Sequence, residues 1–322
     1  MRYVIIGAGA VGGTIGGRLH EAGHDVVLVA RGAHLDALRS DGLRLAEPGR
    51  TRTLRIPTAA TPADVGWGRD DVAVMATKTQ HSAALLDALA DVAPDVPVVC
   101  AQNGVTNERL AADLFAHVLA ICVMLPAEHL EPGLVLSYSA PTPGVLDVGR
   151  YPTGADGLAE QISVDLTAAG FSSHADPAIM RWKYRKLVGN LGNAAEAACG
   201  YDDPGLRELF AAARDEGERG LAAAGIDVAS RAEDKARRGD LIAIHPVDGQ
   251  ARQGGSTWQS LQRGAGSVEA EHLNGEIVRL GRRHGVPTPV NATLLQVVED
   301  MARAGRAPGS YAAVDLLAQA RR

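Results

Sequence analysis

Lysine is scarce in this chain, which draws attention to the lysines that remain. Of the 32 basic residues only four are lysines, and these are Lys78, Lys183, Lys186 and Lys235. Arginine stays protonated in proteins, whereas a lysine can give up a proton to a reaction. The lysines are therefore the first candidates for proton transfer.

Two asparagines follow Lys186 at helical spacing. Asn190 and Asn193 stand at positions i+4 and i+7, so the three side chains share one face of a predicted helix. Leu187 and Val188 lie on other faces and indicate that this helix is largely buried. In a poorly hydrated site the pKa of a lysine falls, which would bring proton transfer within reach near neutral pH. The spacing predicts a site for a small molecule.

The other polar residues near Lys186 have different expected roles. The amides of Asn190 and Asn193 could hydrogen-bond a substrate hydroxyl or carboxylate. Lys183 and Arg185 are expected to be solvated charges on the surface.

A glycine-rich sequence of the form GxGxxG follows the first predicted strand. Gly7 permits a tight turn, Gly9 leaves room for a pyrophosphate, and Gly12 lets helix and strand approach closely. The N–H groups at the start of the following helix would face the phosphates, with help from the helix dipole. We expect the loop to bind a dinucleotide through Gly7, Ala8, Gly9, Ala10, Val11 and Gly12.

The end of the second predicted strand indicates which dinucleotide binds. An acidic residue at this point accepts a hydrogen bond from the ribose of NAD(H). Here Arg31 follows the strand, and the first acid after it is Asp36. A guanidinium suits a 2′-phosphate through charge-assisted hydrogen bonds, so we expect NADPH/NADP+ as the cofactor. His34 could assist in that contact.

Two regions with different patterns of apolar residues must position these side chains. Up to about residue 150, short apolar runs alternate with helical patterns, which predicts a parallel, doubly wound Rossmann sheet. The interval 43–58 alternates polar and apolar residues and predicts an inserted hairpin. The expected strands are 3–6, 25–30, 72–76 and 98–101, and the expected helices are 11–22, 33–40, 80–92 and 107–116.

The second half of the chain becomes helical. Runs at 121–125, 135–138 and 144–148 predict antiparallel strands that extend the sheet. The fold class is thus α/β, an N-terminal Rossmann domain (1–175, NADP-binding) with an all-helical C-terminal domain (176–322, substrate-binding and catalytic), and the substrate is expected in the cleft between them. The expected helices are 178–199, 204–224, 230–239, 256–284 and 290–303.

Composition excludes several classes of partner. Hydrophobic residues make up 46% and charged residues 22%, and the net charge is −6, so no basic block is available for nucleic acid or a membrane surface. Neither a signal peptide nor a membrane span is predicted. The cysteines lack metal-binding spacing and predict buried thiols in the cytoplasm, with no metal site. They are Cys100, Cys122 and Cys199.

Six segments of the chain, taken in order, form a recognisable set. They are Ile6–Gly12, Arg31, Lys78-Thr79-Gln80, Gln102-Asn103-Gly104-Val105, Trp182–Asn190, and Glu269 with Asn274-Gly275 and 285–289. By these segments the chain resembles the ketopantoate reductase family over essentially its whole length. That resemblance implies reduction of a 2-oxo acid, with ketopantoate (2-dehydropantoate) to pantoate as the leading reaction.

The resemblance also implies residue roles. Lys186 would be the general acid, and Glu269 would hydrogen-bond the substrate hydroxyl and tune the lysine. Lys78 would serve the cofactor or substrate, and Asn103 the nicotinamide ribose and the substrate. Ser256 or Thr257 would bind the substrate carboxylate.

Several alternatives stay open. The family has a second asparagine at position 194, where this chain has Ala194 after Asn193, and Trp258 adds bulk near the expected carboxylate site. One of Glu271, Glu276 and His272 could act in place of Glu269. The run 245–255 could be a lid, and a homodimer remains open. Other readings are a β-hydroxyacid or opine dehydrogenase, or an NADP(H) sensor without turnover.

Overall fold

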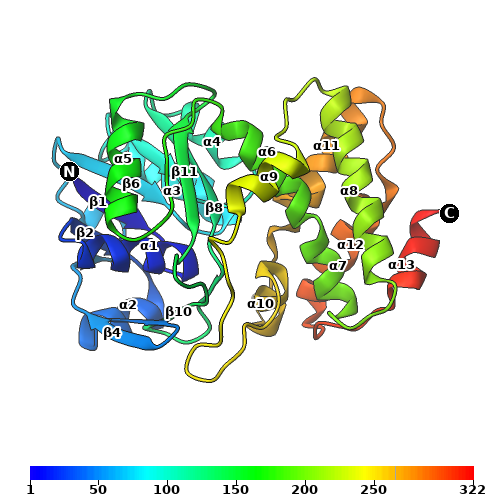
Figure 1. The fold of residues 1–322 in the computed structure, drawn as a ribbon, viewed down its shortest axis with the longest axis horizontal. Coiled ribbons are helices and arrows are strands. Elements are labelled where there is room, and N and C mark those ends of the chain that lie inside the picture. The colour runs from blue at the N-terminus through cyan, green and yellow to red at the C-terminus, as the bar shows by residue number, and fades with distance from the viewer. Residues whose placement is uncertain (265) are drawn as a thin grey trace. The chain divides into compact units, whose positions relative to one another are not determined.

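The computed structural model describes residues 1–264 and 266–322. The chain divides into two compact units, the first of Met1–Lys183 with Arg231–Arg252 and the second of Tyr184–Ser230 with Gln253–Arg322. Figure 1 shows the sheets and the helices of both units along the chain. The assignment of residues 1–175 and 176–322 to separate functional domains stays a prediction.

Within the described residues, the first unit is built on a seven-stranded sheet of order β11-β8-β7-β6-β1-β2-β5. Neighbouring strands from β8 to β5 are parallel, and β11 at the edge is antiparallel to β8. The predicted doubly wound sheet is confirmed. The strands are β1 (Arg2–Ile6), β2 (Asp25–Val29), β5 (Thr58–Ala59), β6 (Asp71–Met75), β7 (Val98–Cys100), β8 (Val118–Met124) and β11 (Val145–Arg150).

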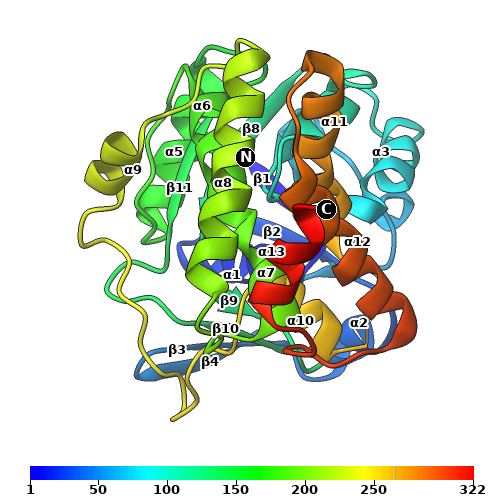
Figure 2. The ribbon, with the colours of Figure 1, turned by 90° about the vertical axis from the view of Figure 1, so that its right-hand side faces the viewer.

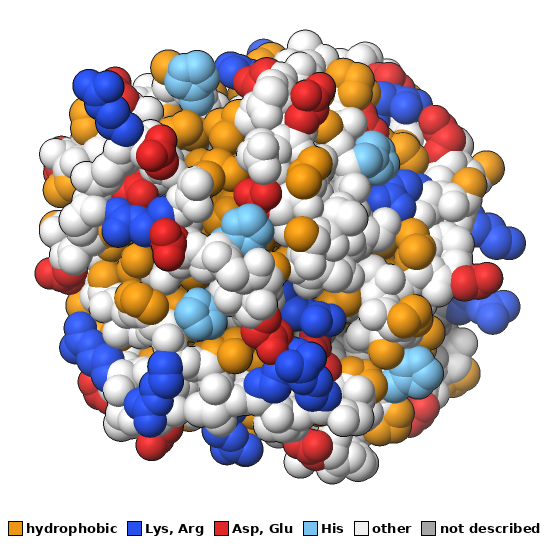
Figure 3. All heavy atoms as spheres, turned by 60° about the vertical axis from the view of Figure 1, so that its left-hand side comes forward, with side chains coloured by type: hydrophobic (Ala, Val, Ile, Leu, Met, Phe, Trp, Pro, Cys, Tyr) orange, Lys and Arg blue, Asp and Glu red, His pale blue; other side chains and the backbone are white. Residues whose placement is uncertain are grey.

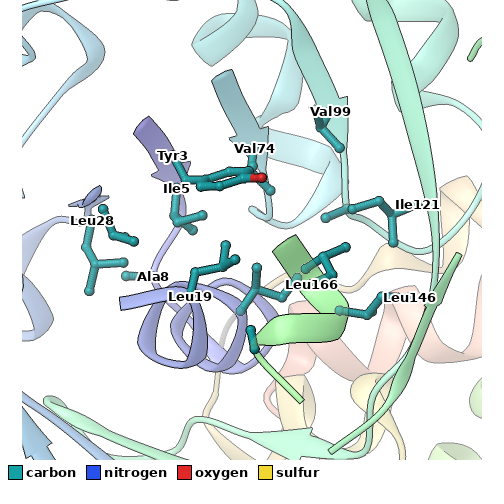
Figure 4. Close-up of a cluster of buried hydrophobic side chains, with 14 of the residues drawn as sticks. Tyr3, Ile5, Ala8, Leu19, Leu28, Val74, Val99, Ile121, Leu146 and Leu166 are labelled. Carbon is teal, nitrogen blue, oxygen red and sulfur yellow. The ribbon is translucent and has the colours of Figure 1, made fainter. Parts of the chain in front are cut away.

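Both faces of this sheet are covered, which explains why its strands are apolar almost throughout. On one face, Ile5 of β1 belongs to a buried cluster with Leu19 of α1 (Ala10–Glu21) and Leu166 of α5 (Gly157–Ala168) (Figure 4). On the other face, Ile6 belongs to a cluster with Leu86 of α3. Successive residues of a strand point to opposite faces, so β1 contributes to both cores.

The helices of the first unit include α5, which the sequence did not predict, and α9, which the sequence placed in the helical domain. Helix α6 contains the boundary between the units. Basic and acidic side chains are interspersed on the face shown in Figure 3. The helices are α1 (Ala10–Glu21), α2 (Gly32–Ser40), α3 (Ser82–Ala90), α4 (Asn107–Ala112), α5 (Gly157–Ala168), α6 (Ile179–Asn190) and α9 (Arg231–Arg238), with short 3-10 helices η1 (Pro62–Asp64) and η2 (Thr79–His81).

A second sheet holds the predicted hairpin. Strands β3 (Leu43–Glu47) and β4 (Arg50–Leu54) are antiparallel neighbours, so the hairpin at 43–58 is confirmed. Strand β10 (Leu134–Ser137) pairs parallel to β3 and antiparallel to β9 (Ala127–Glu128). The prediction that the three strands of 121–148 extend the main sheet as antiparallel strands was therefore wrong for β10, which lies in the second sheet, and for β8, which is parallel to β7. It is confirmed for β11, which is antiparallel to β8. The short apolar pattern of β10 does not specify which neighbour it pairs with.

The second unit is helical. Helix α12 packs against α7, α8, α11 and α13, and α10 packs against α7, and Figure 2 presents this bundle toward the viewer. The helices are α7 (Gly192–Cys199), α8 (Leu206–Ala223), α10 (Ser256–Gln262), α11 (Asn274–His284), α12 (Pro289–Ala304) and α13 (Ala313–Ala320), with a 3-10 turn η3 (Glu269–His272).

Two predicted long helices are each broken, so the predictions of one helix over 178–199 and one over 256–284 were wrong. The first stops at Asn190, and Asn274 Nδ2 donates to the carbonyl of Leu191 at the break (3.2 Å). A Cβ on Gly192 would lie 2.5 Å from the ring of Phe210, so α7 packs closely on α8. The second stops at Gln262, shortly before Gly264 with φ +61°. Glycine weakens a helix interior and favours such ends.

Candidate functional site

The glycine-rich loop joins β1 to α1 at the carboxyl edge of the parallel sheet. Gly7 has φ +103°, and a Cβ there would lie 2.6 Å from Thr77 Cγ2 in the segment after β6. A Cβ on Gly12 would lie 2.0 Å from the carbonyl oxygen of Gly7. The fold itself therefore requires glycine at these two positions.

Gly9 differs from its neighbours in the loop. A Cβ on Gly9 would meet only His129 Cδ2, at 3.9 Å, which is ordinary contact. Gly9 is the N-cap of α1 and has no side chain to cap the helix, whose first turn carries no acid. Space at Gly9 and uncapped N–H groups at a helix N-terminus are what a pyrophosphate needs. The loop fits a dinucleotide.

His34 is bonded to the backbone of the glycine-rich loop. Its Nε2 lies 2.8 Å from the carbonyl oxygen of Ala8, and its Nδ1 accepts the N–H of Gly133 at 2.9 Å. Burial lowers the pKa of His34, an effect that the hydrogen bond to Ala8 partly opposes. Both ring nitrogens of His34 are thus bonded to the backbone. His34 therefore holds the loop in place and has no ring nitrogen left for the suggested contact with a 2′-phosphate.

Arg31 lies between β2 and α2 and is exposed. Its Nη2 is 3.3 Å from Nε2 of His81, which ends the 3-10 turn after β6. Two basic side chains thus meet at the point where the second strand ends. Lys78 begins the same turn and is half-buried.

Asn103 lies in the loop that follows β7 and is half-buried. The registers of β1 with β6 and of β6 with β7 align the carboxyl ends of these strands. The loops carrying Gly7, Lys78 and Asn103 therefore leave the sheet at the same edge, where ligands bind in doubly wound folds.

The prediction that Lys183 and Arg185 are solvated surface charges was wrong. Lys183 is 3% exposed, and its Nζ lies 2.5 Å from Glu108 Oε1. Arg185 donates to the carbonyl of Ala229 and pairs with Glu218. The sequence carried a signal for Lys183, because it occupies the i+4 position between Ile179 and Leu187 on an apolar helix face.

In the second unit, α6 and α7 carry the predicted Lys186, Asn190 and Asn193, all of them half-buried. Asn190 Nδ2 is buried and has no hydrogen-bond partner among the described residues. Asn193 lies beyond the helix break, against Gly255, where an added Cβ would be 3.3 Å from Asn193 Oδ1. The break therefore places Asn193 beside the start of α10.

The start of α10 holds Ser256 and Thr257. Ser256 Oγ is buried without a hydrogen-bond partner in the described part of the chain, and Thr257 is 2% exposed. Glu196, which the sequence analysis did not single out, accepts the N–H of Gly255 at 2.7 Å and so fixes α10 to α7. The Trp258 side chain packs on Gly254, where a Cβ would lie 2.6 Å from its ring.

Glu269 and Glu271 lie in η3, and Glu276 lies in the following helix α11. Glu269 is 6% exposed in the 3-10 turn before α11. Glu271 and Glu276 both form ion pairs with Arg279, so each carboxylate lies beside a positive charge. Burial lowers the pKa of His272, and the charge of Glu269 acts in the opposite direction. The catalytic role expected of Glu269 stays a prediction.

The glycine-rich loop at the carboxyl edge of a parallel sheet and the polar residues of the helical unit define a class, the dinucleotide-dependent oxidoreductases. Two family models match, "Ketopantoate reductase PanE/ApbA" over residues 3–152 and "Ketopantoate reductase PanE/ApbA C terminal" over residues 178–302. The chain belongs to the ketopantoate reductase family. It is an oxidoreductase that acts on a CH–OH group and uses a nicotinamide cofactor.

Relatives and solved structures agree with this assignment. A 2-dehydropantoate 2-reductase of Archaeoglobus fulgidus is 32% identical over 92% of this chain and 96% of its own, and one of Halobacterium salinarum is 30% identical over 95% and 100%. The enzyme of Pyrococcus horikoshii matches at 31% over 59% of this chain and 61% of its own. A PanE/ApbA family ketopantoate reductase structure from Ralstonia eutropha has a TM-score of 0.78 at 27% identity, covering 95% of this chain and 100% of its own.

A structure of D-mandelate dehydrogenase with NADH and anilino(oxo)acetate shares the fold, with a TM-score of 0.79 at 22% identity, covering 95% of this chain and 99% of its own. Within the described residues, every helix is too short or too polar to cross a bilayer. The predicted family and fold class are thereby confirmed.

Proposed function

We propose that this protein reduces ketopantoate to pantoate with NADPH, with Lys186 as the general acid. The observation that carries the proposal is the pair of buried donors in the second unit, Asn190 Nδ2 and Ser256 Oγ, which have no acceptor in the described protein. Buried donors without partners are costly unless a ligand supplies the acceptors. The carboxylate and carbonyl oxygens of a 2-oxo acid are such acceptors.

The first unit supports NADPH over NADH. Arg31 occupies the point at which NAD-binding proteins carry an acid, and its guanidinium lies beside His81. Two basic groups suit the 2′-phosphate of NADPH, which carries the extra negative charge. The pyrophosphate would bind along Ala8, Gly9, Ala10 and Val11, with Lys78 and Asn103 toward the nicotinamide ribose.

The second unit would hold the oxo acid. Asn190 donates to the substrate hydroxyl or carbonyl, and Ser256 and Thr257 donate to its carboxylate. Asn193, beside the start of α10, takes the place of the asparagine that the family has at position 194. Trp258 packs on Gly254, so its indole ring lies against the loop that precedes α10.

In the reaction, bound NADPH would supply the hydride to the carbonyl carbon. Lys186 first polarises the carbonyl oxygen through its ammonium group and then donates a proton to that oxygen, which becomes the hydroxyl of pantoate. Overall, the oxo acid, NADPH and one proton give the hydroxy acid and NADP+. Glu269 accepts a hydrogen bond from the substrate hydroxyl and favours the charged form of the lysine before transfer.

The test is a substrate and cofactor panel on the purified protein. NADPH oxidation followed at 340 nm should be fastest with ketopantoate, and slower with other branched 2-oxo acids and with NADH. Fastest turnover of a different oxo acid would reassign the substrate. Tight NADPH binding without turnover of any oxo acid would instead support a sensor.

A further inference from the structure

The loop after β7 is held in place by an ion pair that lies entirely inside the first unit. Lys183 and Glu108 have side chains that are 2% and 0% exposed, and Lys183 Nζ is 2.5 Å from Glu108 Oε1. Lys183 Nζ also donates to the carbonyl oxygens of Gln102 at 2.9 Å and Ile121 at 3.2 Å. Lys183 Nζ thus combines one ion pair with two hydrogen bonds to backbone carbonyls.

Two of these three partners, Gln102 and Glu108, flank Asn103 in the sequence. Gln102 immediately precedes it, and Glu108 lies in the first turn of α4, the helix that follows the loop. The loop has two further supports, because Gln102 Nε2 donates to Ser82 Oγ at 3.0 Å and Asn107 Nδ2 donates to Thr79 Oγ1 at 3.2 Å. The second support connects the loop to the turn after β6.

Stability alone gives little reason for such a pair. Apolar residues of similar volume often replace a buried ion pair without loss of stability, because two charges must be stripped of water. What the pair does provide is a fixed backbone position at Gln102, since a buried ammonium group held by one carboxylate and two backbone carbonyls tolerates little displacement.

We propose that Lys183 and Glu108 are positioning residues, which hold the Gln102–Gly104 loop so that the Asn103 side chain meets the nicotinamide ribose of the cofactor. This inference rests on the role of Asn103 in the proposed function. Lys183 acts through the backbone of Gln102 and has no contact with the reacting atoms in this account.

A double-mutant cycle tests the proposal. The paired variant Lys183→Met with Glu108→Gln removes both charges, so that neither is left buried alone. We expect it to raise the Kd for NADPH and lower kcat about 10-fold each, since small misplacements of a positioning group have effects of this size or more. In the Asn103→Ala background the same pair of changes should alter either value less than about 2-fold, because the positioned group is already absent.

A matched control separates positioning from stability. Arg2 and Asp71 form an ion pair at 2.5 Å at the amino ends of β1 and β6, the opposite edge of the same sheet. Arg2→Met with Asp71→Asn should lower the melting temperature and leave the Kd for NADPH and kcat unchanged. If the Lys183/Glu108 variant does not fold, Ser82→Ala, which removes only the acceptor of Gln102 Nε2, enters the same cycle with a smaller effect expected.

The outcomes are distinct. Losses that disappear in the Asn103→Ala background support the proposal. Additive losses, no loss, or an Asn103→Ala variant with unchanged Kd and kcat would each overturn it. If NADPH binds but no oxo acid is reduced, the proposed function fails. The double-mutant cycle, measured through the Kd for NADPH, then still tests the positioning role of Lys183 and Glu108. A wild-type protein that does not bind NADPH would overturn both.

Discussion

His34 Nε2 lies 2.8 Å from the carbonyl oxygen of Ala8, so a side chain of α2 is bonded to the backbone of the loop proposed to hold the cofactor phosphates. On the other side of the ring, Nδ1 accepts the N–H of Gly133. An acceptor at Nδ1 must be unprotonated, which leaves the hydrogen on Nε2 to be donated to Ala8. The neutral ring is the form that fits both contacts.

This contact predicts a pH dependence. Burial lowers the pKa of His34 from its ordinary value of 6.5, so below that pH the unfolded chain binds a proton that the folded chain resists. Stability should therefore fall as the pH drops below 6.5, and the Kd for NADPH should rise as the folded ring itself protonates. Urea unfolding and NADPH titration at pH 5.5 and 7.5 measure both effects.

His34→Gln should reduce this pH dependence, and His284→Gln, at an exposed position, should retain it. An unchanged pH dependence in His34→Gln would contradict the structural role assigned to His34.

Gly9 and Gly12 should respond differently to alanine. Gly9→Ala meets only ordinary contact with His129, so the protein should keep its stability while the Kd for NADPH rises about 10-fold or more, because the methyl group occupies the phosphate position. Gly12→Ala places a carbon 2.0 Å from the Gly7 carbonyl and should lower the free energy of unfolding by about 1–3 kcal/mol or more. Chemical denaturation and NADPH titration of the two variants separate the effects. Tight NADPH binding by Gly9→Ala would argue against the pyrophosphate site.

Much of this arrangement could be predicted from the sequence, because glycine-rich loops and apolar strands are local patterns. The doubly wound sheet, the hairpin at 43–58 and the loop Gly7–Gly12 all follow from such patterns. The sequence analysis missed features that depend on distant contacts. The partner of Lys183 is 75 residues away at Glu108, and the neighbour of β10 is β3 rather than a strand of the main sheet.

The helix break between Asn190 and Asn193 depends both on a local pattern and on a distant contact. Gly189 and Gly192 weaken the helix there, but the break also needs Asn274, which donates to the freed carbonyl of Leu191. The position of Asn193 beside Gly255 follows from that break and was not predicted from helical spacing.

Arg31→Ala should change cofactor preference. Loss of a charge-assisted contact of about 1.5–3 kcal/mol corresponds to an increase of about 10- to 100-fold in the KM for NADPH. The KM for NADH, which has no 2′-phosphate, should change little. Arg39→Ala, at an exposed position in the helix that follows Arg31, serves as the control. Equal changes for both nucleotides would rule out Arg31 as the 2′-phosphate ligand.

Ser256→Ala should affect the oxo acid and not the nucleotide. The buried Ser256 hydroxyl has no partner among the described residues, and a hydrogen bond to a carboxylate contributes about 1.5–3 kcal/mol, so the KM for ketopantoate should rise about 10-fold or more. The Kd for NADPH should stay as in the wild type. Gln262→Ala at the exposed end of the same helix should leave both unchanged. An unaltered KM in Ser256→Ala would place the carboxylate elsewhere.

The central claim is that Lys186 donates the proton to the substrate carbonyl. The measurement is kcat of Lys186→Ala with saturating ketopantoate and NADPH, beside its Kd for NADPH and beside Lys235→Ala, which removes an exposed lysine of α9. Loss of a general acid predicts a fall in kcat of about 10²- to 10⁴-fold with nucleotide binding retained and with Lys235→Ala fully active. A Lys186→Ala enzyme with near wild-type kcat would contradict the account.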